Sequence, residues 1–310
     1  MILNTGSRTD IPAYYSKWFM NRVREGFVLV RNPFDACHVT RYETNPEIVD
    51  ILAFCTKNPA PMLQHLEELK KNYRMIWHVT ITPYGKDIEP NVPDKHHMLQ
   101  VFQSLSRAIG KDACFWRYDP VFISDKYSIA YHMRAFETMC SALEGFVSIV
   151  VVSFIDLYEK TKRNFPEVHE VSLSDQETLA QYFQQTASRH GMKVHVCMEN
   201  ASLSRFGVDT SGCFTQQLLE RATHVTLNPP FMQRARPGCA CLLSADIGAY
   251  NTCGHFCRYC YANYDKETVM RNMSLHDANS PLLIGHLEEG DKIFVHKGKS
   301  WLDRRMRLEL

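Results

Sequence analysis

The 310-residue sequence is informative first through what it lacks. Its formal net charge is only +1, which argues against a protein that binds nucleic acid over a broad basic surface. No segment approaches the ~18 uncharged apolar residues of a membrane-spanning helix, and the first residues hold neither a basic stretch nor a long apolar run. Glycine-rich phosphate-binding loops of the G-x-G-x-x-G or Walker type are missing too. We therefore expect a cytoplasmic protein with no membrane partner and no nucleic acid partner.

Short β-branched and aromatic runs alternate with longer amphipathic stretches over residues 1–228. The pattern predicts eight strands, at Ile2–Thr5, Phe27–Arg31, Val49–Thr56, Met75–Thr82, Ala113–Tyr118, Val147–Phe154, Lys193–Met198 and His224–Leu227. Eight strands separated by helices is the count of an α/β fold of the TIM type, the parallel (β/α)8 barrel, and a doubly wound open sheet is the main alternative. We expect residues 1–228 to form the barrel. Residues 229–310 would form a C-terminal cysteine-rich appendage packed on the barrel.

Charged side chains follow several of the predicted strands. Turn chemistry explains the many Asn, Asp and Pro residues there, but it explains the cations less well. The carboxyl ends of parallel strands meet on one face, where barrel enzymes keep their active sites. Cations gathered on that face would suit an anionic or carboxylate-bearing small-molecule substrate. The residues that we predict to be catalytic are Arg31, Lys57, Arg117 and Asp119.

Cysteine is abundant and unevenly placed: five of the eleven cysteines fall within 22 residues. A cytosolic chain keeps its thiols reduced, so this clustering favours metal, cluster or redox chemistry over disulfides. Cys253, Cys257 and Cys260 form a C-x3-C-x2-C pattern. Three such thiolates can bind three irons of a [4Fe-4S] cluster and leave the fourth iron for a non-protein ligand. Zinc is the alternative, held by Cys239 and Cys241 with two ligands from Cys253, Cys257, Cys260 or His255.

A second group of thiols follows the seventh predicted strand. Cys197 lies at the end of that strand and Cys213 in the following turn. Together with Cys239 and Cys241 they could form a second site, a four-thiolate iron–sulfur cluster. Alternatively, Cys239 and Cys241 only support the loop of the first cluster. The remaining cysteines, Cys37, Cys55, Cys114 and Cys140, stand alone in apolar or helical context and are predicted to be core residues.

The spacing of Cys253, Cys257 and Cys260, with Tyr259 before the last cysteine, resembles the C-x3-C-x-aromatic-C signature of the radical S-adenosylmethionine (radical SAM) superfamily. The chain as a whole resembles an uncharacterised prokaryotic family of unknown function with its cysteine cluster at the C-terminus. Four stretches carry this second resemblance: Thr5–Pro12, Thr56–Pro59, Trp116–Pro120 and Asp246–Asn251.

The resemblance implies a [4Fe-4S] cluster whose open iron binds S-adenosylmethionine and cleaves it, with one electron from a reductant such as ferredoxin or flavodoxin, to start radical chemistry. Tyr259 would contact the adenine. The superfamily places its motif after the first strand, whereas here it follows the last, so other contacts to the cofactor must come from elsewhere in the chain. We assign them to Arg8, Glu199 and Asn200, with Arg117 as a further candidate.

The leading functional hypothesis is therefore an iron–sulfur enzyme that resembles radical SAM enzymes. The alternative is a zinc- or iron–sulfur-containing binding or sensor protein without catalysis, acting on nucleic acid through Arg234, Arg236 and the basic C-terminal residues. A metal-independent barrel enzyme with a structural cysteine appendage is a third option.

Overall fold

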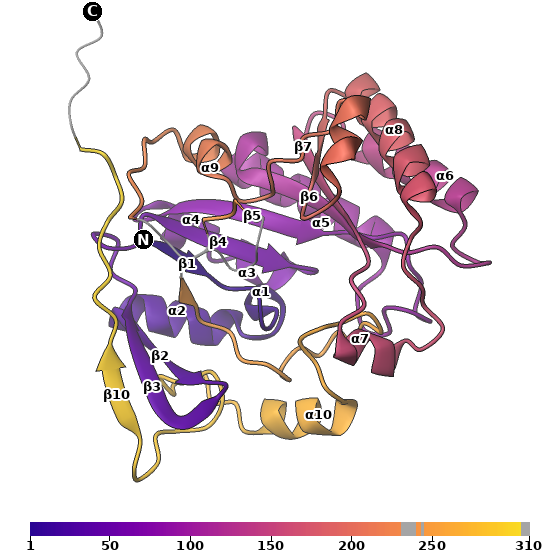
Figure 1. The fold of residues 1–310 in the computed structure, drawn as a ribbon. Coiled ribbons are helices and arrows are strands. Elements are labelled where there is room, and N and C mark those ends of the chain that lie inside the picture. The colour runs from indigo at the N-terminus through magenta and orange to yellow at the C-terminus, as the bar shows by residue number, and fades with distance from the viewer. Residues whose placement is uncertain (231–239, 243–244, 305–310) are drawn as a thin grey trace, which may run out of the picture.

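The computed structural model describes residues 1–230, 240–242 and 245–304 of the chain (Figure 1). Its centre is a seven-stranded parallel sheet with the strand order β8-β7-β6-β5-β4-β1-β9. The strands are β1 (Ile2–Asn4), β4 (Ile51–Thr56), β5 (Arg74–Thr80), β6 (Cys114–Val121), β7 (Ile149–Phe154), β8 (Lys193–Val196) and β9 (Ala245–Asp246). Six of them follow one another in chain order, and β9 is added beside β1.

The expected closed barrel is wrong. β8 and β9 form the two edges of the sheet, and no pairing joins them within the described residues. The predicted eighth strand, His224–Leu227, lies outside the sheet, where Leu227 makes an isolated antiparallel bridge to Leu302. Closure requires continuous pairing between the first and last strands, and β9 spans only two residues. The fold is an open parallel α/β sheet, the class that includes Rossmann-like and flavodoxin-like folds.

The helices of the described residues connect and cover these strands. They are α1 (Ile11–Tyr14), α2 (Ser16–Glu25), α3 (Ala60–Leu63), α4 (Leu66–Lys70), α5 (Lys95–Ile109), α6 (Ile129–Leu143), α7 (Glu159–Asn164), α8 (Leu173–Arg189), α9 (Gln216–Thr223) and α10 (Lys266–Ser274), with 3-10 turns at Lys111–Ala113 and Ala201–Phe206. The longest ones start at side-chain caps: Ser128 accepts from the N–H of Tyr131 before α6, and Asp94 caps α5.

Aromatic pairs join the layers of the core. Phe54 of β4 stacks on Trp77 of β5 with ring centroids 4.0 Å apart. Phe136 of α6 stacks on Phe183 of α8 at 4.1 Å, and these two helices lie side by side (Figure 1). None of the helices in the described part of the chain combines the length and the apolarity that crossing a lipid bilayer requires.

A second, three-stranded sheet contains one of the strands predicted for the barrel. β2 (Phe27–Asn32) pairs antiparallel with β3 (Asp35–Glu43), and β10 (Lys292–Val295) pairs parallel with β3. The predicted strand at Phe27–Arg31 is therefore a strand, but it belongs to this sheet and not to the main one. The C-terminal residues also contact α2, because the indole N–H of Trp18 donates to the carbonyls of Ser280 and Leu282.

Candidate metal centres

Three cysteines from distant parts of the chain meet beyond the end of β8. Cys197 directly follows β8, Cys213 lies in the loop before α9, and Cys241 lies shortly before β9. The Sγ atoms of Cys197 and Cys213 are 3.3 Å apart, those of Cys213 and Cys241 are 3.7 Å apart, and all three lie within 4.8 Å of one another. Cys213 is buried and the other two are half-buried. The three thiols form a group that could hold a metal ion.

The backbone around these thiols is bent in ways that few residues tolerate. Met198, directly after Cys197, has a φ of 64°, and Gly212, directly before Cys213, has a φ of 116°. Left-handed backbone is costly for a residue with a side chain and easy for glycine. A hydrogen bond from the N–H of Leu242 to the carbonyl of Phe214, 2.9 Å long, joins the segments that carry Cys213 and Cys241. Local turns and a backbone hydrogen bond between the two segments therefore fix the positions of the thiols.

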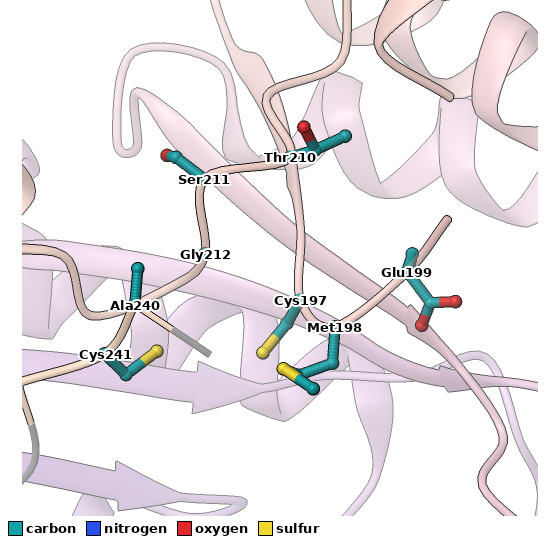
Figure 2. Close-up of a pocket in the computed structure, with 8 residues that line it drawn as sticks. All are labelled: Cys197, Met198, Glu199, Thr210, Ser211, Gly212, Ala240 and Cys241. Atoms are coloured by element: carbon teal, nitrogen blue, oxygen red, sulfur yellow. The ribbon is translucent and has the colours of Figure 1, made fainter. Parts of the chain in front are cut away.

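A cavity of about 130 Å³ opens beside this group. Figure 2 shows Cys197 and Cys241 pointing into the same space between the two chain segments. The lining residues are Cys197, Met198, Glu199, Thr210, Ser211, Gly212, Ala240 and Cys241. The carboxylate of Glu199 accepts from the N–H of Phe154 at 2.8 Å. Burial raises the pKa of Glu199 to about 8, and the negative charges of its acidic neighbours contribute in the same direction.

Arg117 of β6 approaches the same thiols from the sheet. Its Nη1 lies 3.8 Å from Sγ of Cys213, and its guanidinium forms an ion pair with Asp119, which also accepts from the hydroxyl of Ser153. Burial alone would lower the pKa of Arg117. The negative charge of Asp119 has the largest opposite effect, and together with the nearby thiols it raises this pKa well above its usual value. Arg117 is thus a half-buried cation beside a thiol.

The C-x3-C-x2-C stretch forms a separate loop, which is anchored at several points. The amide of Asn263 donates to the carbonyl of Cys253, and the amide of Asn91 donates to that of Gly254, both at 2.8 Å. Phe256 has a φ of 55°. A methyl group at position 254 would lie 2.9 Å from a ring carbon of Tyr14, which is closer than real contacts allow. The backbone of this loop therefore has little freedom.

The three thiols of this loop interact with one another electrostatically. Burial raises the pKa of all three; for Cys253 the charges of Asp10, Cys260 and Cys257 act in the same direction, and the pKa of Cys257 reaches about 12 despite Lys57 nearby. The N–H of Ala262 donates to Sγ of Cys260 at 3.3 Å. Unlike the Cys197 group, these Sγ atoms do not all lie within 4.8 Å of one another. A cubane cluster binds each thiolate to a different iron, so its ligands stand farther apart than those of a single ion.

A buried carboxylate, Glu89, organises the charges beside the loop. It accepts from the ammonium of Lys57 and the hydroxyl of Thr82, both at 2.8 Å, and also from Lys95 and the hydroxyl of Tyr259. Its side chain is completely buried. Burial alone would raise the pKa of Glu89, but Lys57 and Lys95 lower it to about 2. Two cations facing one carboxylate leave this group with a net charge of +1.

Asp10 connects the loop to the first helices through hydrogen bonds. One of its oxygens accepts from the hydroxyl of Thr56 at 2.6 Å, and the other accepts from the backbone N–H of Lys57 at 2.7 Å and lies 2.9 Å from Nε2 of His255. The other ring nitrogen of His255 lies 3.0 Å from the hydroxyl of Tyr14. The histidine inside the cysteine motif is therefore held by side chains that come from the start of the chain.

The sequence matches, over residues 2–262, the family model described as "Domain of unknown function (DUF1848)". The chain belongs to this family. No curated protein matches the sequence. The predicted membership of an uncharacterised family is thereby confirmed, and the match includes every cysteine assigned above to a metal centre. The resemblance to the radical SAM superfamily stays a prediction.

In the DUF1848 chain, four of the eight non-cysteine residues predicted for the site lie within or shortly after strands of the main sheet, near the two cysteine groups. These are Lys57, Arg117, Asp119 and Glu199. Tyr259 lies in the loop itself, with its hydroxyl on Glu89 and its ring 5.4 Å from the ammonium of Lys57.

The other three have local partners elsewhere. Arg31 lies in β2 of the small sheet, where it pairs with Asp291. Arg8 pairs with Asp246 at 3.5 Å, and Asn200 caps a 3-10 turn by accepting from the N–H of Ser202. Arg234, Arg236 and Cys239 lie outside the described residues. Sequence reasoning missed Glu89 and Asp10, because single acidic residues next to a proline or in a turn carry no motif.

Proposed function

We propose that this protein is an iron–sulfur enzyme in which Cys253, Cys257 and Cys260 hold a [4Fe-4S] cluster, and that the cluster cleaves S-adenosylmethionine to begin radical chemistry on a small anionic substrate. The observation that supports this best is the placement of three mutually interacting thiols on one anchored loop, beside charged residues at the carboxyl edge of the parallel sheet. Ligands bind at this edge in open α/β sheets as well as in barrels.

The residues of the loop fit an iron–sulfur cluster in their chemistry. Thiolates are the usual ligands of such clusters, and hydrogen bonds to the sulfurs tune them. The N–H of Ala262 supplies one such bond to Cys260, and Lys57 places a positive charge near Cys257. The cluster, when bound, would supply one electron to a ligand at its open iron.

The protein side chains would bind and orient that ligand. Lys57 and Lys95 outnumber the carboxylate between them, so this group favours a negatively charged partner. Arg117, by contrast, already has Asp119 as a partner, and it offers hydrogen bonds more than net charge. A carboxylate, either of S-adenosylmethionine or of the substrate, would therefore bind more favourably at the lysines than at Arg117.

The test is anaerobic reconstitution with iron and sulfide, followed by incubation with S-adenosylmethionine and dithionite. We expect about four irons lost together in Cys257→Ala, and formation of 5′-deoxyadenosine by the unaltered protein but not by this variant. Cys37→Ala is the matched control, because Cys37 is an exposed thiol in β3. Iron retained in full by Cys257→Ala would contradict the ligand assignment, and a loaded protein that leaves S-adenosylmethionine intact would contradict the activity.

The second candidate is a metal-binding or sensor protein without catalysis. The close spacing of Cys197, Cys213 and Cys241 favours it, because that spacing suits a single ion. A colourless protein that holds zinc and takes up no iron would support this candidate over the first.

A further inference from the structure

We infer that Cys197, Cys213 and Cys241 form a mononuclear site for a thiophilic divalent cation such as Zn²⁺, with a fourth coordination position open to the neighbouring cavity. This differs from the four-thiolate cluster predicted for the region, and it does not depend on the cluster proposed for the Cys253–Cys260 loop.

The spacing of the sulfurs indicates one ion. Two thiolates bound tetrahedrally at about 2.3 Å stand about 3.8 Å apart. The distances of 3.3 Å and 3.7 Å from Cys213 to its two neighbours are close to that value. A cubane would bind each sulfur to a different iron and would hold the sulfurs farther apart. The group therefore needs only small adjustments to accept one ion, and larger ones to accept a cluster.

The surroundings of the middle thiol also suit one ion. Three thiolates and one divalent cation carry a net charge of −1. Arg117, which is half-buried and paired with Asp119, lies 3.8 Å from Cys213, and hydrogen bonding from a second layer of residues stabilises metal-bound ligands. Asp119 orients the guanidinium from its other side. The sheet thus provides a guanidinium N–H donor beside the middle thiol.

The cavity beside the site gives the fourth position. In the described part of the chain, no fourth His, Cys, Asp or Glu joins the group within 4.8 Å. The cavity of about 130 Å³ is lined by two of the thiols and by the small polar residues Thr210 and Ser211. Three protein ligands with an open position are typical of zinc sites that bind water or a substrate. The exogenous ligand would be a water molecule or a small anion or thiolate.

A redox pair is the competing explanation, because 3.3 Å also places Cys197 and Cys213 near the distance for disulfide formation. A disulfide between them would leave Cys241 without a role, whereas a metal ion uses all three thiols. The two explanations predict different amounts of bound metal per chain, and only the metal site requires Cys241.

The experiment uses the full chain, stripped of metal under reducing conditions and titrated with Zn²⁺ and then with Co²⁺. We expect one equivalent of Zn²⁺ and a thiolate-to-Co²⁺ absorption band. Cys213→Ser should weaken Zn²⁺ binding at least 100-fold, and Cys241→Ser should weaken it similarly, so misfolding of one variant does not decide the result. Cys114→Ser is the matched control, because Cys114 is a buried thiol in β6 outside the group. Cys257→Ala should keep this Zn²⁺, which separates the site from the proposed cluster.

Four results would overturn the inference. They are no stoichiometric metal in the unaltered chain, full Zn²⁺ affinity in Cys213→Ser and Cys241→Ser, iron and inorganic sulfide lost together in Cys213→Ser, or a Cys197–Cys213 disulfide that forms as readily with Zn²⁺ present as without it. Azide or a small thiol should shift the Co²⁺ spectrum. A spectrum that no small ligand shifts would refute the open position.

Discussion

Replacement of Glu89 by glutamine is the sharpest test of the charge arrangement beside the cysteine loop. The change keeps the shape of the side chain and removes its charge. Four donors face this carboxylate: Lys57, Lys95, Thr82 and Tyr259. A glutamine has one acceptor oxygen, and its amide group would present N–H bonds to donors. Both ammonium groups would then lack a counter-ion in a site where the carboxylate is completely buried.

The size of the effect follows from two independent routes. Removal of one partner of a buried ion pair costs about 3–5 kcal/mol. The second route uses the pKa of Glu89, which Lys57 and Lys95 lower from 4.5 to about 2 against the opposite effect of burial. At about 1.4 kcal/mol for each pKa unit, this shift corresponds to roughly 3 kcal/mol in favour of the ionised form. We therefore expect Glu89→Gln to lower the free energy of unfolding by about 3–5 kcal/mol at pH 7.

The pH dependence has a definite sign. The pKa of Glu89 is lower in the folded chain than in the unfolded chain, so the unfolded state takes up a proton first as the pH falls. The stability that this carboxylate contributes is complete above pH 4.5 and is lost as the pH falls towards 2. Glu89→Gln should remove this part of the acid sensitivity, because the variant has no proton to take up at position 89.

The assay is denaturant unfolding of the metal-free protein, compared with Glu68→Gln as the control. Glu68 forms a bidentate ion pair with Arg24 at the surface, with N–O distances of 2.8 Å and 2.7 Å. Exposed pairs of this kind contribute about 0–1 kcal/mol. An equal decrease in the free energy of unfolding for the two variants would refute the reasoning. A decrease of less than about 1 kcal/mol for Glu89→Gln would refute it too.

Three further predictions concern the loop, the core and a buried histidine. Gly254→Ala should keep the fold but lower the iron content after reconstitution, because the new methyl group would lie 2.9 Å from the ring of Tyr14; normal iron content in a folded variant would contradict this. Phe183→Ala should cost about 3–5 kcal/mol in denaturant unfolding without changing metal content, since it removes the ring stacked on Phe136. Burial lowers the pKa of His132 to about 4. As the pH falls, His132 therefore takes up a proton in the unfolded chain first, and the free energy of unfolding should decrease between pH 6.5 and pH 4 by up to ~1.4 kcal/mol per pH unit. His132→Gln should flatten this slope in unfolding measurements.

Local signals predicted individual elements well. The apolar residues of Ile129–Leu143 recur at helical spacing and form α6 with those bounds, and the valine-rich run before Phe154 forms β7. Both signals are short-range: an apolar face at helical spacing, and an uninterrupted apolar run the length of a strand. β3 was missed because residues 35–43 hold charged and polar side chains in a strand that is largely exposed or half-buried. The composition of His224–Leu227 predicts a strand, but these residues lie outside both sheets.

Sheet closure could not be predicted in this way, since it depends on which edges pair across long sequence separations. The same limit applies to the site. The Cys253–Cys260 spacing is visible in eight residues, whereas Cys197 and Cys241 are 44 positions apart and meet next to the turns at Met198 and Gly212. Glu89 carried no signal, because its burial depends on two lysines that the chain brings to it from separate elements.

The absence of a closed barrel does not remove the reason for a site at the strand ends. Neighbouring parallel strands place their carboxyl ends at one edge whether or not the first and last strands pair. β4 and β6 belong to one parallel sheet, and they bring Lys57 and Arg117 to the same edge, where Asp119 acts electrostatically on both cations. Arg31 shows the converse. It lies in a strand, β2, whose partner is antiparallel in another sheet, and it pairs with Asp291 instead of joining that edge. Convergence of charged residues in this chain therefore depends on shared parallel pairing, and the cysteine groups lie where that pairing places the charges.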